Sequence, residues 1–259
     1  MNNIKDLSLD LESVHKNNPL IHCITNYVAM NFTANSLLAI GASPLMSFCS
    51  EEMEEIVSKC DALCINIGCL DTQQTEAMKV AVEATLKYNK PWVLDPVGVG
   101  ISNIRTKICN SLIDIKAPAV IRGNYSEIAF LTGAQKDIRS LENKFGNDKE
   151  MREITSQLAL RIGSVVVASG ATDYISDGKD VDEIILGHPM MAKVTAMGCV
   201  SSAIISAFVA IDDNHFSAAH NAMTLVGDIG AKVAKTCSGN GTFVSQFIDN
   251  LYNAQRNLK

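Results

Sequence analysis

The segment Lys193–Val200 (Lys-Val-Thr-Ala-Met-Gly-Cys-Val) joins a turn of small residues to a Gly-Cys pair at the start of a long apolar helical pattern. The first backbone N–H groups of a helix have no partner within the helix and carry a partial positive charge, so they can bind a phosphate. The same position would lower the pKa of the Cys199 thiol and favour the thiolate. The sequence therefore predicts an anion-binding turn with one reactive cysteine. The alternative is an ordinary glycine-containing loop before a buried helix.

Charged and polar side chains follow three predicted strands. Asp95 follows the apolar run Trp92–Leu94, Arg122 to Glu127 follow Ala119–Ile121, and Ser169 and Gly170 follow Ser164–Ala168. Ligands of open α/β sheets bind beyond the carboxyl ends of the strands. We therefore expect these side chains to face the turn before Cys199.

Together these residues could form a phosphoryl-transfer site. Asp95 and Glu127 can hold Mg²⁺, Arg122 can bind nucleotide phosphates, and the Gly-Cys turn can bind the transferred group. Each also has a structural interpretation, because an Asp-Pro pair often forms a turn and Glu127 could be a first-turn acid behind an N-capping Ser126. The chain contains neither a G-x-x-x-x-G-K-[ST] loop nor a G-x-G-x-x-G sequence opening a helix. This argues against a P-loop and against a dinucleotide fingerprint.

Helical and strand-like segments alternate along most of the chain, which is typical of a parallel sheet covered by helices. Apolar runs at 62–67, 91–94, 119–121 and 164–168 predict strands buried on both faces. Helices are expected over Asn26–Ile40, from Ser50, and from near Cys199, Phe216 and Phe243. Residues 173–176 and 181–186 predict a hairpin that could form a sheet edge. No linker stands out, so we expect one α/β domain over residues 1–259.

The composition excludes several classes of protein. The net charge is −6 and the acidic residues are dispersed, so we expect no nucleic-acid partner. No apolar run approaches the roughly 20 residues of a membrane span, and Met1–Asp6 does not resemble a leader, so we expect a cytoplasmic protein with no membrane contact. The eight cysteines are expected to be reduced thiols. Cys60, Cys64 and Cys69 lack the paired spacing of a zinc site.

Several motifs carry a family resemblance. Asn124–Glu127 resembles the N-x-x-E motif of ribokinase-like kinases, and Ala196–Cys199 resembles their anion-hole turn. Five segments in the same order are similar to hydroxyethylthiazole kinases: His22–Val28, Leu94–Gly100, Arg122–Asn124, the cysteine-containing turn at 196–199, and Gly239–Phe243. The resemblance spans about residues 21–243, nearly the whole chain.

The resemblance implies a ribokinase-like three-layer αβα sandwich with a mostly parallel central sheet. It implies ATP-dependent phosphorylation of the hydroxyl of 4-methyl-5-(2-hydroxyethyl)thiazole, a salvage step of thiamine biosynthesis, in a homotrimer whose active sites lie between subunits. Asp95 and Glu127 would act at Mg²⁺; Arg122, Asn124, Ser169 and Thr195 would contact ATP; Asn26, Met46, Gly68 and Ala196 would form the thiazole pocket; Gly198 and Cys199 would be catalytic.

Two residues depart from the family pattern. Ala196 stands where glycine is usual, and its Cβ disfavours a positive φ. Met197 is bulky for a position that is normally small. Related sugar kinases carry an aspartate, their candidate base, at the position of Cys199. Because the loose transition state of phosphoryl transfer requires little deprotonation in advance, we expect the backbone N–H groups to contribute most and the thiolate to be an auxiliary acceptor.

Other functions stay open on the sequence alone. Cys199 could be a covalent nucleophile of a hydrolase, with His188 or His220 as its base. The same fold could also serve a hydroxymethylpyrimidine kinase, an ATP-dependent hydratase or a nucleotide sensor without turnover.

Overall fold

The computed structural model describes residues 6–134 and 148–256, and the strands within these ranges form one sheet. The strands are β1 (Leu20–Ile24), β2 (Ser43–Leu45), β3 (Ala62–Asn66), β4 (Trp92–Asp95), β5 (Val120–Asn124), β6 (Val165–Ser169), β7 (Asp173–Ser176) and β8 (Val181–Ile184). Their order across the sheet is β2-β1-β3-β4-β5-β6-β7-β8. The pairs from β2 to β6 are parallel, whereas β7 and β8 pair antiparallel.

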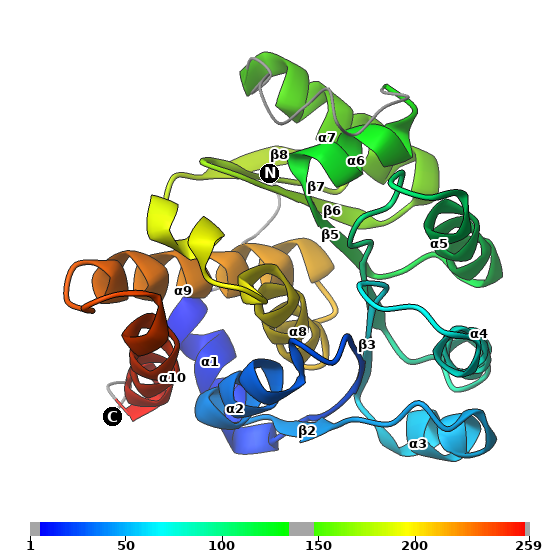
Figure 1. The fold of residues 1–259 in the computed structure, drawn as a ribbon, viewed down its shortest axis with the longest axis horizontal. Coiled ribbons are helices and arrows are strands. Elements are labelled where there is room, and N and C mark those ends of the chain that lie inside the picture. Colours follow the sequence, from blue (N-terminus) through cyan, green and yellow to red (C-terminus); the bar gives the residue numbers. More distant parts are fainter. Residues whose placement is uncertain (1–5, 135–147, 257–259) are drawn as a thin grey trace.

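Helices cover both faces of this sheet (Figure 1). One layer contains α1 (Leu7–Asn17), α2 (Met30–Ile40), α8 (Met197–Val209), α9 (His215–Ala234) and α10 (Asn240–Arg256). The other contains α3 (Met53–Lys59), α4 (Thr72–Lys87), α5 (Asn103–Ile115), α6 (Tyr125–Thr132) and α7 (Asp148–Ile162). Short 3₁₀ turns, η1 (Ser50–Glu52) and η3 (Pro189–Lys193), precede α3 and α8. The expected three-layer αβα architecture is confirmed.

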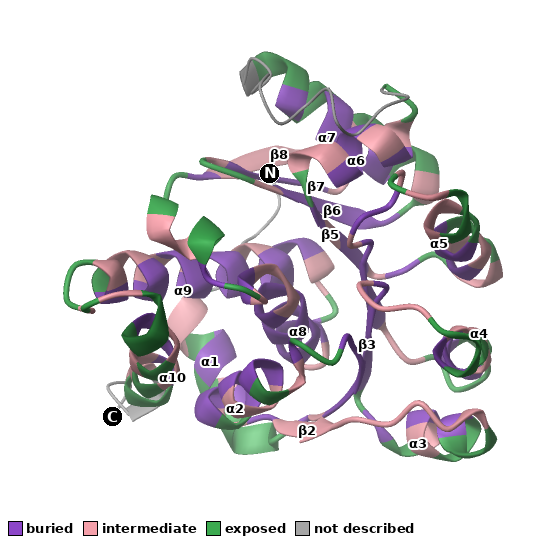
Figure 2. Cartoon of the chain, viewed as in Figure 1, coloured by how far each residue is buried: buried purple, intermediate pink, exposed green. Residues whose placement is uncertain are grey.

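Alternate strand residues supply two separate cores. Cys64 packs in the core on the α8 side, whereas its strand neighbours Leu63 and Ile65 pack in the core on the α4 side. Successive side chains of a strand point to opposite faces, so a strand covered on both faces must be apolar throughout. Figure 2 shows the resulting pattern, with buried central strands and with outer helices such as α4 and α5 buried on the side that faces the sheet.

Helix α8 is the most enclosed helix of its layer. It packs against β1, β3, β4 and β5 and against α2 and α9, and residues 200–209 are all buried. A helix surrounded in this way has to be apolar on every side. Its buried serines donate to carbonyls four residues earlier, with Ser201 Oγ 2.8 Å from the Met197 oxygen. The sheet and this layer therefore hold the first turn of α8 above the carboxyl ends of the central strands.

Most predicted elements are present with shifted ends. The hairpin is confirmed, and its second strand, β8, lies at the sheet edge. The expected helix over 26–40 begins only at Met30, and the one expected from Ser50 begins with a 3₁₀ turn. Strand β5 runs on to Asn124, so Arg122 lies within the strand rather than after it. No helix in the described ranges is long and apolar enough to cross a membrane.

Candidate active site

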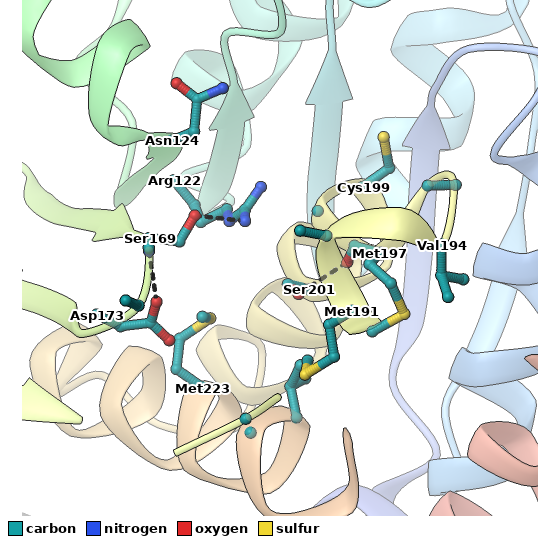
Figure 3. Close-up of a pocket in the computed structure, with 18 of the residues that line it drawn as sticks. Arg122, Asn124, Ser169, Asp173, Met191, Val194, Met197, Cys199, Ser201 and Met223 are labelled. Carbon is teal, nitrogen blue, oxygen red and sulfur yellow. Dashed lines mark hydrogen bonds between the residues drawn. The ribbon is translucent and has the colours of Figure 1, made fainter. Parts of the chain in front are cut away.

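A cleft of about 800 Å³ opens between the carboxyl ends of β4, β5 and β6 and the turn before α8. Nine of the twelve residues assigned to the site from the sequence line it: Asp95, Arg122, Asn124, Glu127, Ser169, Thr195, Ala196, Gly198 and Cys199. Met191 and Met223 form an apolar part of its wall, away from Asn124 and Cys199 (Figure 3). The cleft therefore has a charged region and an apolar region, as a nucleotide requires.

The turn before α8 leaves donors free for an anion. The helix begins at Met197, and its N-cap Ala196 has a φ of 67° in the left-handed region. Among the described residues, the N–H groups of Gly198 and Cys199 donate to no protein acceptor. Both residues line the cleft. Two free N–H groups at the positive end of a buried helix form an anion hole.

Gly198 lies against the end of the Arg122 side chain. A Cβ built on Gly198 would overlap Nη1 of Arg122, so a side chain there would displace the guanidinium. The guanidinium therefore lies directly against the anion-hole turn. Its Nη2 donates to Ser169 Oγ at 2.6 Å, and its buried Nε has no partner among the described residues (Figure 3). Since guanidinium donors match phosphate oxygens, Arg122 and the turn can bind the same anion from two sides.

Glu127 and Asn124 are joined in a capping box. Asn124 Oδ1 accepts from the Glu127 N–H at 3.0 Å, and Glu127 Oε2 accepts from the Asn124 N–H at 2.8 Å. The N-cap of α6 is therefore Asn124, and the alternative in which Ser126 fills this place is wrong. The second carboxylate oxygen, Oε1, accepts from the Gly98 N–H at 2.8 Å. These bonds hold Glu127 at the end of β5 beside the Asp95-Pro-Val-Gly turn.

Both buried carboxyl groups are costly to ionise. Burial and then the charge of Asp95 raise the pKa of Glu127 to about 7. The backbone hydrogen bonds to Glu127 and the charge of Arg122 lower this pKa, but by less. Burial also raises the pKa of Asp95, which Arg122, the nearby Ser202 hydroxyl and the Asn66 amide lower. Asp95 Oδ1 is buried and accepts no hydrogen bond of normal geometry from the described residues. Two buried carboxylates with one unused oxygen favour a bound cation.

These residues suit Mg²⁺ supplied together with phosphate oxygens. No group of three or more His, Cys, Asp and Glu side chains in the described ranges could hold a metal ion alone. Mg²⁺ commonly binds through one or two carboxylates, substrate phosphates and water, so Asp95 and Glu127 are a sufficient protein contribution. Glu127, with both oxygens already hydrogen-bonded, is better placed to act through water than directly.

The expected thiolate form of Cys199 is contradicted by its surroundings in the fold. Burial and then the charge of Asp95 raise its pKa to about 12, and Arg122 and the amides of Asn26 and Asn66 lower it only in part. The helix N-terminus was expected to dominate, but the loss of solvent and the adjacent carboxylate outweigh it. The thiol is therefore neutral at physiological pH, and it cannot serve as an auxiliary thiolate acceptor.

The proposed partners of a nucleophilic cysteine are engaged elsewhere. His188 Nδ1 accepts from the Met190 N–H at 3.2 Å, and His220 Nε2 lies 3.3 Å from Asp182 Oδ2. The Cys199 sulfur instead accepts hydrogen bonds from two amides, Asn26 Nδ2 at 3.3 Å and Asn66 Nδ2 at 3.2 Å. This arrangement gives no support to a hydrolase mechanism, which requires a base beside the thiol.

The three remaining predicted residues do not line the cleft. Asn26 lies behind Cys199 and donates to its sulfur, and Gly68 donates its N–H to Asn66 Oδ1 at 2.8 Å. Met46 is half-buried and packs against the core on the α8 side. Asn26 and Gly68 thus form one cluster next to Cys199, separate from the nucleotide-sized cleft.

Sequence reasoning missed three polar residues around the site. Asn66 ends β3 and bonds to both Asp95 and Cys199. Asp173 lines the cleft and accepts from the Gly170 N–H at 3.0 Å, and burial raises its pKa to about 6. Arg105 donates to the carbonyls of Val97 and Gly68 at 2.8 and 2.9 Å. Asn66 could have been found, because it follows an apolar run as Asp95 does.

Comparisons with known proteins agree with this geometry. The model of the hydroxyethylthiazole kinase family matches residues 11–257. A hydroxyethylthiazole kinase of Leptospira biflexa is 41% identical over 249 residues, covering 96% of this chain and 93% of its own. The structure of a hydroxyethylthiazole kinase protein from Pyrococcus horikoshii has a TM-score of 0.88 and 35% identity, covering 97% and 94% of the two chains.

A more distant structure shares only the fold. A ribokinase-like superfamily protein from Enterococcus faecalis has a TM-score of 0.68 and 15% identity, and the match covers 100% of this chain and 91% of that one. The expected ribokinase-like sandwich is thereby confirmed.

Proposed function

Because the chain belongs to the hydroxyethylthiazole kinase family, we propose that its cleft transfers the γ-phosphoryl group of ATP to the hydroxyl of 4-methyl-5-(2-hydroxyethyl)thiazole. The observation that carries this function is the pair of free N–H groups at Gly198 and Cys199, which line one cleft together with Arg122 and the Asp95 carboxylate. Such a site stabilises charge on a transferred phosphoryl group. The product supplies the salvage branch of thiamine biosynthesis, and the reaction fits an enzyme that works in the cytoplasm.

The nucleotide would occupy the length of the cleft. Arg122, held by Ser169, would bind its phosphates, with Thr195 in the turn opposite. Asn124 has its carbonyl oxygen committed to the capping box, so only its Nδ2 would be free to contact ATP. The apolar wall at Met191 and Met223 suits a base. These roles would bring the γ-phosphate to the first turn of α8.

Catalysis in this site would depend on position and charge. The N–H groups of Gly198 and Cys199 would receive the oxygens of the transferred group, and Arg122 would neutralise the developing charge from the other side. A bound Mg²⁺, held by Asp95 and through water by Glu127, would supply further neutralisation. The neutral Cys199 thiol would contact the acceptor hydroxyl without removing its proton in advance.

The thiazole would bind on the far side of Cys199 from the nucleotide. Asn26, Gly68 and Met46 would line that side, with Ala196 at the turn between the two substrates. Tyr27 and Val28, directly after Asn26, are 58% and 65% exposed. We propose that a neighbouring subunit of a homotrimer covers these apolar side chains and completes the pocket.

A coupled assay of ATP consumption tests this function. Hydroxyethylthiazole, hydroxymethylpyrimidine and ribose would each be offered as acceptor, with and without Mg²⁺. We expect ADP release with hydroxyethylthiazole that depends on Mg²⁺, and far less with the other two alcohols. Release of ADP with none of the alcohols would contradict the kinase function, and preference for the pyrimidine would reassign it.

A further inference from the structure

We propose that Asn66 is a positioning residue of the phosphoryl-transfer centre, whose single amide nitrogen holds both the Asp95 carboxylate and the Cys199 thiol in place. The inference rests on the proposed function for its consequence in catalysis. Its geometric basis is independent of that function. The residue belongs to none of the motifs that carry the family resemblance.

The position of Asn66 follows from the sheet. Asn66 ends β3 and lies in register with Asp95, which ends β4. Its side chain is almost completely buried, and its Nδ2 is 2.6 Å from Asp95 Oδ2 and 3.2 Å from Cys199 Sγ. An amide nitrogen carries two hydrogens, so one is available for each acceptor. The carboxylate on the sheet and the thiol on α8 are thus joined through one atom.

The orientation of this amide is fixed by its other end. Asn66 Oδ1 accepts from the Gly68 N–H at 2.8 Å and from Asn26 Nδ2 at 3.0 Å. A flipped amide would place NH₂ against the Gly68 N–H and its oxygen against the Asp95 carboxylate. Asn26 is fixed in turn, because its Oδ1 accepts from the Ala29 N–H at 3.0 Å. Backbone donors therefore determine which atoms face Asp95 and Cys199.

The two amides lie close against Gly68. A Cβ on Gly68 would lie 2.7 Å from Asn66 Oδ1 and 3.0 Å from Asn26 Nδ2. Gly68 therefore serves as the floor of the amide pair. A buried polar cluster with every amide group paired is rigid, and the removal of one member leaves others unsatisfied.

The bonds of Asn66 determine which atoms of Asp95 and Cys199 stay available to a ligand. Asp95 Oδ2 is occupied by Asn66, which leaves the buried Oδ1 as the oxygen available to a cation or a substrate. The Cys199 sulfur receives two amide hydrogens, so its own S–H must point away from Asn26 and Asn66. Loss of Asn66 would remove one donor from each group at once, leaving Asn26 on the sulfur, and would raise the energy of the ionised carboxylate.

Substitution of Asn66 tests the proposal through the pH profile of kcat/KM. Asn66→Ala removes the donor, and Asn66→Asp replaces it with a second carboxylate next to Asp95. Since two adjacent carboxylates share a proton, the acidic limb should move to higher pH in the order wild type, Asn66→Ala, Asn66→Asp, by about one unit or more in the last.

Asn221→Asp is a matched control. Asn221 is a buried asparagine of α9 whose Nδ2 donates to the buried Asp10 carboxylate at 2.8 Å, so the substitution creates the same carboxylate pair in the core. Asn221→Asp should reduce thermal stability about as much as Asn66→Asp does. It should leave the acidic limb of the kcat/KM profile at the same pH as in the wild type. An unshifted limb in Asn66→Asp, or an equal shift in Asn221→Asp, would overturn the positioning role.

A second readout does not depend on kinase activity. The rate of alkylation of Cys199 by iodoacetamide, followed on its own peptide by mass spectrometry, is proportional to the thiolate fraction. Above the acidic limb, where both carboxylates of Asn66→Asp are ionised, the added charge should slow alkylation about tenfold per unit of raised thiol pKa, whereas Asn221→Asp should match the wild type. An equal rate in Asn66→Asp and wild type would refute the contact with Cys199, even if the wild type proved not to be a kinase.

Discussion

The thiol of Cys199 has a different character from the one that its position suggests. A cysteine at a helix N-terminus normally has a lowered pKa, but this one is buried beside Asp95 and its pKa rises to about 12. The residue's chemistry is therefore set by its neighbours across the fold rather than by its place in the helix. A neutral thiol that accepts two amide hydrogen bonds is suited to contact a hydroxyl group.

Substitution of Cys199 should separate the backbone contribution from that of the side chain. We expect Cys199→Asp to keep or improve kcat, because the amides of Asn26 and Asn66 can donate to a carboxylate. Cys199→Ala should retain a measurable fraction of kcat, since the free N–H groups stay in place. Steady-state kinetics with hydroxyethylthiazole decide this. Complete loss of activity in both variants would show that the sulfur itself is essential.

Ala196 carries backbone strain that can be removed. Its φ of 67° disfavours a side chain. Ala196→Gly should relieve about 1–2 kcal/mol of strain and lose part of this to the greater freedom of the unfolded chain, for a net gain of about 0.5–1 kcal/mol. Thermal unfolding should show a rise in Tm of ~1–4 °C.

Asn89→Gly is the control for this change. Asn89 also has a positive φ, of 50°, but asparagine tolerates that region, so little change in Tm is expected. A lower Tm in Ala196→Gly would mean that the Ala196 methyl group contributes more by packing than it costs in strain.

At the scale of elements, strand β5 and helix α6 act as one unit. The Asn124–Glu127 capping box joins them, and the Glu127–Gly98 hydrogen bond attaches this unit to the turn after β4. Glu127 therefore joins these elements and also places a buried carboxyl group beside Asp95. Whenever this carboxyl group is ionised, its burial lowers the free energy of unfolding.

The stability of the free protein should reflect this cost. Burial, and then the Asp95 charge, raises the pKa of Glu127 to about 7 from 4.5. The folded state thus binds this proton more tightly than the unfolded state. The contribution of Glu127 to the free energy of unfolding is therefore greatest below pH ~4.5 and is lost as the pH rises through 7. Between pH 4.5 and 8, wild type should lose up to ~3 kcal/mol relative to Glu127→Gln.

Chemical denaturation of both proteins at pH 4.5, 6 and 8 measures this difference. Glu76→Gln, at an exposed position of α4, provides the control and should follow the wild type at each pH. Parallel stability curves for wild type and Glu127→Gln would contradict the raised pKa of Glu127.

At the scale of the whole molecule, one chain lines the proposed nucleotide cleft, but the cluster at Asn26, Gly68 and Cys199 lies near exposed apolar residues. Tyr27 and Val28 follow Asn26 directly, and they are the kind of side chains that an interface covers. This asymmetry agrees with a nucleotide site formed by one subunit and an acceptor pocket completed by another.

Val28→Glu should dissociate the assembly. Size-exclusion chromatography with light scattering should give about three times the chain mass of 27.9 kDa for wild type and a smaller species for Val28→Glu, with lower activity. Leu160→Glu changes a residue of α7 that is 72% exposed on the opposite helical layer, and it should leave the trimer intact. Wild type at the mass of one chain would contradict the shared pocket.

The sequence by itself determined a parallel sheet covered by helices, the main strands and the edge hairpin. These follow from local rules, because apolar periodicity selects strands and helices and a parallel sheet brings the residues after its strands to one edge. The family resemblance added the three-layer sandwich and the roles of Asn124, Ser169, Thr195 and Ala196, which line the cleft.

Only the tertiary structure decided how these residues behave. The neutral thiol of Cys199, the placement of Arg122 against Gly198 and the amide bridge of Asn66 arise between segments far apart in the chain. Their physical causes are loss of solvent, charge at short range and close packing, which depend on distances that spacing along a sequence does not contain.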